Sequence, residues 1–393
     1  MTIAPVLAVV VSLMACVAGA AAQAPLTLGE TFAVESKVMA EQRRVIVWTP
    51  AHYAEGTQAY PVLYVTDADR QFGHTVTTVE FLSRNGRMPP MIVVGIFNTD
   101  RTRDLTPYKD TDDDTQLPTA GGGDRFLRFM ETELVPWVER QYRTQAFRAF
   151  AGHSFGGLFA MHALATRPNL FNAIVAVSPT LAWRQGEAVK RIDTTLTQQR
   201  TLKGALYVTL GDEGQAMKAG LDRLRTVLEE KAGKGLRWDL VEMLDEDHGS
   251  LVLRSHYNAF EKIFDGWRLP RTRNGTFKGG WNAVEAHYAR LSDRLGWAIT
   301  PPEATVNALG YAALAQREID DALEYLQANV RNYPDSANAY DSLGEALEAA
   351  GRLDDALAKY EEAIKRAEAG KDPLLEAFIQ HRDAVRRKLA QGR

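Results

Sequence analysis

The chain of 393 residues has a single cysteine, Cys16, and therefore cannot form a disulfide within itself. Its 46 basic and 50 acidic side chains give a net charge of −4, and no stretch concentrates Lys and Arg. Because nucleic-acid backbones are bound by dense basic patches, we expect no nucleic-acid partner. No pair of His or Cys residues has the spacing of metal ligands, so we expect neither a metal site nor a cofactor.

The apolar stretch at the start of the chain, residues 3–17, is too short for a membrane-spanning helix. Small residues ending in Ala20-Ala21-Ala22 follow it, so residues 1–22 are predicted to be a secretory signal peptide, although no Lys or Arg stands at its start. The alternative is a lipoprotein box at Leu13-Met14-Ala15-Cys16 with Cys16 lipidated, but Met14 is unusual there. An exported chain without disulfides fits a bacterial periplasm or the culture medium.

Short apolar segments alternate with helical segments between residues 27 and 267. The apolar runs have the character of buried parallel strands, which need helices on both faces. Strands are expected at residues 32–39, 43–48, 62–66, 91–97, 147–151, 173–177, 205–210 and 238–243, and helices at 124–142, with a kink at Pro136, and at 251–267. This order predicts an α/β fold with a doubly wound, mostly parallel sheet.

Residues 268–280 (RLPRTRNGTFKGG) lack periodicity and are predicted to be a linker. Beyond them, Leu309-Gly310 recurs at Leu343-Gly344, and Asp320-Asp321-Ala322-Leu323 recurs at Asp354-Asp355-Ala356-Leu357, both at an offset of 34 residues. That period indicates two tetratricopeptide repeats, at about 303–336 and 337–370, in an all-helical domain of residues 281–390. Two repeats alone would expose apolar faces, so helices at 281–295 and about 373–389 are expected to cover them.

The pentapeptide Gly152-His153-Ser154-Phe155-Gly156 lies between a predicted strand and a helix-forming run. This is the setting of a nucleophile elbow, a sharp turn that holds a serine hydroxyl where a base can reach it. Glycines suit the flanking positions because a tight turn leaves no room for Cβ. The alternative, a glycine-rich turn with a solvated serine, is weaker because strand and helix both flank the motif, so Ser154 is the candidate nucleophile.

A base and an acid should follow the serine in chain order, each after a strand of the sheet. His248 follows the last predicted strand, whereas the other seven histidines follow no late strand. The alternative is a surface histidine among acids. Asp212 and Glu213 both follow the strand at 205–210, and spacing alone leaves the choice of acid open.

Two backbone N–H groups are expected to hold a developing oxyanion, those of Phe155 at the elbow and Asp69 after the strand at 62–66. Candidate substrate-binding side chains are Arg70, Arg103 and Trp183. For Arg103, a role in gripping an anionic substrate and structural pairing with Asp104 or Asp110 remain open.

Several short blocks stand in a fixed order over about residues 27–267: Pro61-Val62-Leu63-Tyr64 with Asp67, Arg103-Asp104-Leu105-Thr106-Pro107, Gly152-His153-Ser154-Phe155-Gly156-Gly157, Ser178-Pro179, Gly211-Asp212-Glu213-Gly214 and His248-Gly249-Ser250. Together, and in this order, they resemble the putative-esterase family of α/β-hydrolases, which includes ferric-siderophore esterases, esterase D and mycolyltransferases. The resemblance implies Glu213 as the acid, because relatives commonly carry a glutamate shortly before a methionine, here Met217. It leaves the oxyanion geometry open, since many relatives have Asp-Gly where this chain has Asp67-Ala68.

The sequence therefore predicts an exported serine esterase with a Ser-Glu/Asp-His triad that acts through an acyl-enzyme. By resemblance, siderophore trilactones are the leading substrate class, with plant-polymer acyl esters and other small esters open. One alternative is an acyltransferase with the same nucleophile. Another is an interaction protein in which the repeats bind a peptide or protein and the hydrolase domain is vestigial.

Overall fold

The computed structural model describes residues 27–391 apart from His52, Glu55, residues 110–116, Asn274 and Thr276. The predicted signal peptide at residues 1–22 and Cys16 lie outside the described residues. None of the helices in this part of the chain combines the length and the apolarity that a bilayer crossing requires.

Eight strands form one mixed sheet in the order β1-β2-β4-β3-β5-β6-β7-β8. β2 pairs antiparallel with β1 and β4, and every other pairing is parallel. The strands are β1 (Glu30–Ser36), β2 (Glu41–Trp48), β3 (Tyr60–Thr66), β4 (Ile92–Ile96), β5 (Thr144–His153), β6 (Ala173–Val177), β7 (Gly204–Gly211) and β8 (Leu236–Met243). The predicted α/β fold is confirmed, and the carboxyl ends of five neighbouring parallel strands, β3 and β5 to β8, share one edge of the sheet.

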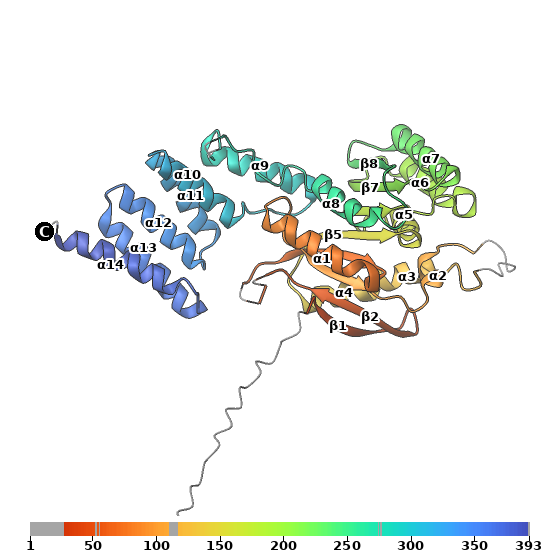
Figure 1. Ribbon diagram of the computed structural model, residues 1–393, viewed down its shortest axis with the longest axis horizontal. Coiled ribbons are helices and arrows are strands. Elements are labelled where there is room, and N and C mark those ends of the chain that lie inside the picture. The colour runs from red at the N-terminus through yellow and green to blue at the C-terminus, as the bar shows by residue number, and fades with distance from the viewer. Residues whose placement is uncertain are drawn as a thin grey trace, which may run out of the picture.

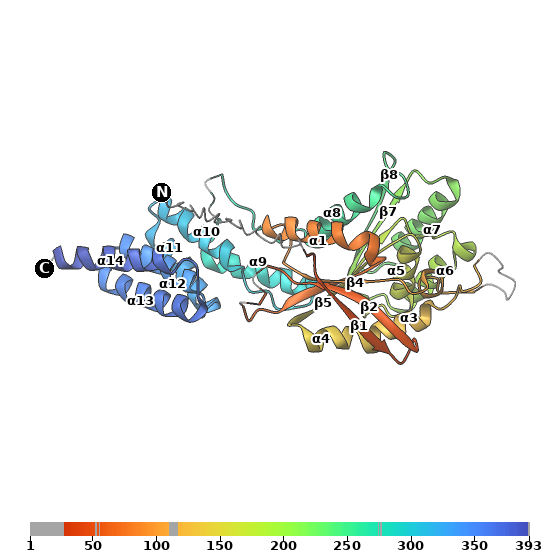
Figure 2. The same cartoon turned by 60° about the horizontal axis from the view of Figure 1, so that its bottom comes forward.

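Helices cover both faces of this sheet, as its fully buried strands require. Side chains of β3 alternate between the faces: Leu63 and Val65 belong to one buried cluster, Val62 and Tyr64 to the other. The first face is covered by α1 (Ala68–Arg84) and α8 (Leu251–Ile263) (Figure 2). The second is covered by α3 (Gly123–Phe129), α4 (Val135–Gln141), α5 (Phe155–Thr166), α6 (Glu187–Gln198) and α7 (Gln215–Lys231).

The segment predicted as one kinked helix is divided into α3, a π-helical turn at Met130–Leu134, and α4. Pro136 is in the first turn of α4 and has no N–H to donate to the preceding turn. A wider turn directly before it carries the helix past the missing hydrogen bond.

Six further helices follow: α9 (Gly280–Leu295), α10 (Glu303–Ala315), α11 (Ile319–Asn332), α12 (Ala337–Ala349), α13 (Leu353–Gly370) and α14 (Leu375–Gln391) (Figure 1). The glycines of the 34-residue repeat lie where the two helices of each pair cross. A Cβ on Gly310 would lie 2.5 Å from Cγ of Leu326, and one on Gly344 would lie 2.6 Å from Cε1 of Tyr360. Close helix contact therefore explains why glycine stands at both positions.

The first of these helices packs onto the α/β part of the molecule. Val284 and Tyr288 of α9 are buried in the same cluster as the α1 and α8 face of the sheet. Trp297, just after α9, lies with its ring 5.0 Å from that of Phe147 on β5 and 6.4 Å from that of Trp267. The helical region thus continues the apolar core of the sheet.

His256 of α8 is buried beneath the sheet, where its Nδ1 lies 3.1 Å from Oγ1 of Thr75 on α1. The ring of His74 lies 5.2 Å away. Burial lowers the pKa of His256 to about 3, so the imidazole is neutral in the folded protein near pH 7.

This buried histidine predicts a loss of stability in acid. Its folded pKa of about 3 lies below the ordinary value of 6.5, so the unfolded chain binds more protons between these values. Each pH unit below 6.5 should cost up to about 1.4 kcal/mol in the free energy of unfolding. Urea unfolding from pH 7 to pH 4, which is about 2.5 units below the ordinary value, gives the free energy of unfolding at each pH. This free energy should depend less steeply on pH in His256→Asn than in the wild type.

Leu253→Asn is the control, because Leu253 is exposed on the same helix and its replacement should leave the pH slope unchanged. Equal slopes for wild type and His256→Asn would contradict the prediction.

Candidate active site

The turn after β5 places Ser154 in a strained conformation. Ser154 has φ 60° and ψ −115°, an unusual conformation for a residue other than glycine, and α5 begins at the next residue. Its N–H donates to the carbonyl of Val177 at the end of β6 (3.0 Å), and its own carbonyl accepts from Leu158 (2.9 Å). Strain of this kind costs on the order of 1–3 kcal/mol and is found at functional sites.

The flanking glycines are required by contact. A Cβ on Gly152 would lie 2.2 Å from the carbonyl oxygen of Gly156, and one on Gly156 would lie 2.6 Å from Oγ1 of Thr66. Both distances are far shorter than normal carbon–oxygen contacts, so strand β5 and helix α5 can approach this closely only without side chains there. The local structure is thus the expected elbow.

His248 lies in the loop between β8 and α8 and contacts Glu213 at the end of β7. Its Nδ1 is 2.5 Å from Oε2 of Glu213, whose side chain is only 6% exposed. Oε1 of the same carboxylate accepts from the N–H of Gly211 (3.0 Å). Asp212 is exposed, and its backbone N–H donates to the carbonyl of Glu246 (2.8 Å). The two candidate acids therefore differ: Glu213 meets the histidine and Asp212 does not.

Ser178, at the end of β6, is a part of this cluster to which sequence reasoning gave no role. It is fully buried with φ 44°, its Oγ donates to Glu213, and the same Oγ is 3.0 Å from Nδ1 of His248. The available signal was its place directly after a buried strand that neighbours both β5 and β7. A serine there can orient the carboxylate and the imidazole together.

His153 joins the His248 loop to the elbow. Its Nε2–H donates to the backbone carbonyl of His248 (2.6 Å), and the two rings are 4.7 Å apart. Burial lowers the pKa of His153, because it disfavours the charged form of the ring. Among the described residues, the Ser154 hydroxyl makes no hydrogen bond with His248; catalytic hydrogen bonds are often long before substrate binds.

The two proposed oxyanion donors are both at helix starts. Phe155 is the first residue of α5, and Asp69 is in the first turn of α1, where N–H groups have no acceptor within the helix. Arg70 and Gln71 donate their N–H groups to the carbonyl of Asp67 at 2.9 Å each. The side chain of Asp69 is 55% exposed, so its carboxylate faces solvent.

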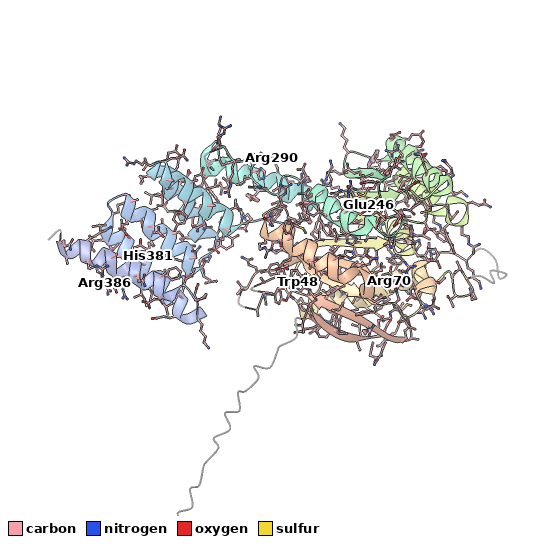
Figure 3. All side chains as sticks on the ribbon, viewed as in Figure 1. Trp48, Arg70, Glu246, Arg290, His381 and Arg386 are labelled. Carbon is pink, nitrogen blue, oxygen red and sulfur yellow. The ribbon has the colours of Figure 1, made fainter. Side chains whose placement is uncertain are left out.

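The candidate binding side chains have different surroundings. Arg70 lies on α1 (Figure 3). Its side chain is 83% exposed, and its Nε is 4.0 Å from Oδ2 of Asp69. The ring of Trp183 lies 5.2 Å from that of Phe155 in an edge-to-face contact, which places this tryptophan beside the elbow.

Arg103 has the structural role that the sequence left open. Its guanidinium pairs with Asp104 (2.7 Å) and with Glu41 (2.5 Å), and Arg43 approaches the same Asp104 at 2.6 Å. Asp110, the other possible partner, lies outside the described residues. Because its donors are engaged by carboxylates, Arg103 is poorly placed to grip a substrate anion.

One group of possible metal ligands occurs in the helical region. Ligand atoms of Asp341, Glu345 and His381 lie within 4.8 Å of one another. Nδ1 of His381 on α14 already pairs with the carboxylate of Asp341 on α12 at 2.9 Å. This ion pair links the last helix to the repeat and does not require a metal ion.

Comparison with known proteins finds a matching family for each of the two parts of the chain. The model of the family described as "Putative esterase" matches residues 36–231, and that described as "Tetratricopeptide repeat" matches residues 307–373. Ferri-bacillibactin esterase BesA of Bacillus subtilis is 31% identical over 219 residues, which cover 49% of this chain and 75% of BesA. A siderophore enterobactin esterase of Emericella nidulans is 28% identical over 254 residues, covering 53% of this chain and 82% of the relative.

Among solved structures, an IroE-like serine hydrolase from Shewanella oneidensis superimposes with a TM-score of 0.69 at 27% identity. The match covers 77% of this chain and 99% of that structure.

The contact between the elbow glycines predicts a sharp effect of one methyl group. Gly152→Ala should lower the free energy of unfolding by at least about 1–3 kcal/mol, because the Cβ meets rigid backbone. Gly370→Ala is the matched control, since nothing lies within 4 Å of a Cβ there. Urea unfolding measures both, and equal stability of the two variants would contradict the proposed packing.

Proposed function

Because the chain belongs to the putative esterase family and is an esterase, we propose that it is an exported serine hydrolase whose nucleophile is Ser154, with His248 as base and Glu213 as acid. The observation that carries the assignment of the triad is the 2.5 Å contact between His248 and the buried carboxylate of Glu213, on the edge of the sheet that also bears the elbow.

The imidazole has a defined task in this mechanism. With Nδ1–H donated to Glu213, the other nitrogen, Nε2, is the one left to take the proton of Ser154. Oγ then attacks the ester carbonyl carbon, and the protonated His248 returns the proton to the leaving alcohol. Water, deprotonated by the same histidine, attacks the acyl carbon, the bond to Oγ of Ser154 breaks, and His248 returns the proton to Oγ as the acid leaves. Glu213 stabilises the imidazolium in both halves of the reaction.

The oxyanion of each tetrahedral intermediate is held by the backbone N–H groups of Phe155 and Asp69. Support comes from their positions at two helix starts, where such donors are unpaired and the helix dipole favours negative charge. Trp183 packs on Phe155 and forms part of the wall around the scissile ester.

For the substrate class we propose siderophore trilactones. Support comes from two relatives, one named a ferri-bacillibactin esterase and the other a siderophore enterobactin esterase. Export to the periplasm or medium is supported by the composition of residues 1–22, which would place the enzyme outside the cytoplasm.

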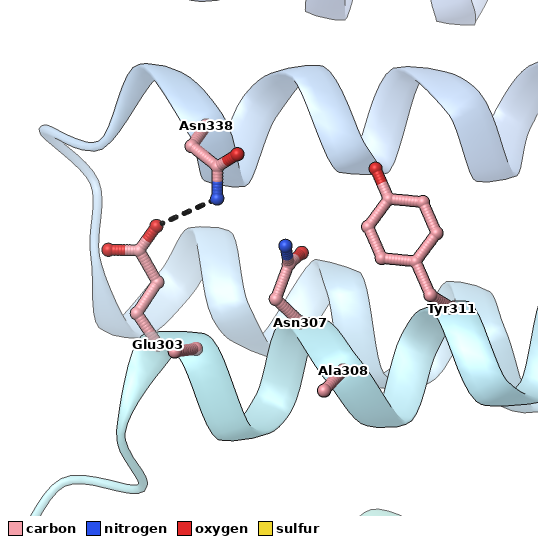
Figure 4. A pocket seen from close by; sticks show the side chains of 6 residues that line it. Glu303, Asn307, Ala308, Tyr311 and Asn338 are labelled. Atoms are coloured by element: carbon pink, nitrogen blue, oxygen red, sulfur yellow. Dashed lines mark hydrogen bonds between the residues drawn. The ribbon is translucent and has the colours of Figure 1, made fainter. Parts of the chain in front are cut away.

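A protein partner for the repeats is supported by a groove of about 670 Å³ between α10 and α12. Glu303, Asn307, Tyr311 and Asn338 are among the side chains that line it (Figure 4). Oδ1 of Asn307 is buried without a hydrogen-bond partner, and Nδ2 of Asn338 donates to Glu303 at 3.3 Å. The amide and carboxylate groups of the lining suit a peptide backbone, Ala304, Ala308 and the ring of Tyr311 add apolar surface, and the groove lies among the repeats.

The central prediction concerns the nucleophile. Ser154→Ala should lower kcat on a ferric trilactone siderophore and on short p-nitrophenyl esters by at least about 1,000-fold, because no other group supplies the attacking oxygen. The control is Ser83→Ala: Ser83 lies on α1, its hydroxyl bonds only within that helix, and its replacement should retain full activity.

The substrate class is tested with feruloyl and acetyl esters measured in parallel. A higher kcat/KM on these esters than on the trilactone would refute the proposed substrate class.

The choice of acid has its own matched pair. Glu213→Gln removes the charge that stabilises the His248 imidazolium and should lower kcat at least about tenfold. Asp212→Asn, one residue away and exposed, should leave kcat nearly unchanged. The opposite ranking in steady-state kinetics on a p-nitrophenyl ester would assign the role to Asp212.

A further inference from the structure

Asp67 is a buried carboxylate in an unusual backbone position next to the elbow. It stands between β3 and α1 with φ 56° and ψ 46°, and its side chain is only 4% exposed. The left-handed conformation is more accessible to Asp and Asn than to most residues. Its carboxylate accepts three hydrogen bonds: from Nδ2 of Asn98 (2.6 Å), and from Nε (2.6 Å) and Nη2 (3.0 Å) of Arg101.

Arg101 in turn reaches the residues on both sides of Ser154. Nη2 donates to the backbone carbonyl of His153 at 3.2 Å, and the guanidinium lies 5.6 Å from the centre of the Phe155 ring. Oδ2 of Asp67 would lie 3.5 Å from a Cβ on Gly156. One ion pair therefore touches the start of α1, the last residue of β5 and the start of α5.

These contacts connect the two segments that carry the proposed oxyanion donors. The N–H of Asp69 belongs to α1 and that of Phe155 to α5, and the two elements come from different parts of the chain. Two donors bind one oxyanion only if both point at the same place, and an error of 1 Å can cost about 100-fold in rate. The order of the strands does not by itself fix the distance between these two N–H groups.

We propose that Asp67 and Arg101 are positioning residues that hold the start of α1 against the elbow and so set the geometry of the oxyanion hole. This inference rests on the proposed function and deepens it. Arg101 also compensates the charge of Asp67, which would otherwise oppose a negative charge developing nearby.

Substitution of Arg101 and substitution of Asp67 should therefore lower kcat by different amounts. Arg101→Gln leaves a buried carboxylate uncompensated beside the developing oxyanion. Asp67→Asn keeps the left-handed turn and the hydrogen bond from Arg101, and leaves a cation whose side chain is already 35% exposed to water. Arg101→Gln is expected to have the larger effect on kcat.

The experiment measures kcat and KM on a p-nitrophenyl ester, and the melting temperature of each protein, for Arg101→Gln, Arg101→Lys and Asp67→Asn. We expect Arg101→Gln to lower kcat about 10- to 100-fold with KM within about threefold. Inhibition by phenylboronic acid, whose tetrahedral adduct places an oxygen in the oxyanion hole, should weaken by the same factor. Arg101→Lys should recover part of both, because it keeps the charge and loses the bidentate geometry.

The matched control is Arg148→Gln. Arg148 lies on β5, the strand that leads into the elbow, and the substitution breaks its 2.6 Å ion pair with Glu139 of α4. If Asp67 and Arg101 only stabilise the fold, their variants and Arg148→Gln should show similar losses of melting temperature, and phenylboronic acid binding should change little. The inference is overturned if all Asp67 and Arg101 variants keep the kcat of Arg148→Gln, or if kcat falls while phenylboronic acid binds as before. Full activity of Ser154→Ala would instead overturn the proposed function, so the two failures are distinguishable.

Discussion

The parallel pairing of β3, β5, β6, β7 and β8 is the constraint on which the rest of the site depends. Register within these pairs brings the ends of strands far apart in sequence to one edge of the sheet. Asp67, Ser154, Ser178, Glu213 and the His248 loop each follow one of these strands. Backbone hydrogen bonds of the sheet thus assemble a cluster of polar side chains that no local segment could form.

Within that frame, side-chain hydrogen bonds adjust the cluster. The carboxylate of Glu213 is nearly removed from water and is satisfied by the Gly211 N–H, the Ser178 hydroxyl and the imidazole of His248. Asp67 is likewise buried and satisfied by Asn98 and Arg101. A buried carboxylate left without such partners would cost several kcal/mol, on the order of the whole stability of a domain. The hydrogen bonds therefore fix both stability and geometry.

The helical region contributes to the same core. Because Trp297 packs on Phe147 and Trp267, and α9 is buried in the cluster beneath α1 and α8, the repeats are attached to the sheet through apolar contact. This continuity fits a bracing role for α9 and Trp297, alongside the partner binding proposed for the groove between α10 and α12.

The local features of the fold could be predicted from the sequence. Buried strands showed as short apolar runs, the elbow as glycines around Ser154, and the helix pairs as a repeat of 34 residues. Such signals are carried by neighbouring residues, or by a fixed offset, because they reflect backbone sterics and close helix contact. The split of the 124–142 helix by a π-helical turn was missed because sequence periodicity shows that Pro136 disturbs a helix, not how the turn before it adjusts.

By itself, the sequence determined the fold class and indicated the glycine-flanked turn at Ser154 and the histidine that follows the last strand. Spacing alone left Glu213 and Asp212 equal, and only the resemblance favoured Glu213; the tertiary structure then showed the contact of Glu213 with His248. The tertiary structure alone gave Ser178 its contacts and placed Arg103 in an ion-pair network while Arg101 faces the elbow. Asp212 and Glu213 are adjacent acids, and Arg101 and Arg103 lie two residues apart, so composition and spacing treat the members of each pair alike. What separates them is the direction in which each side chain leaves its turn, and the packing of distant segments sets that direction.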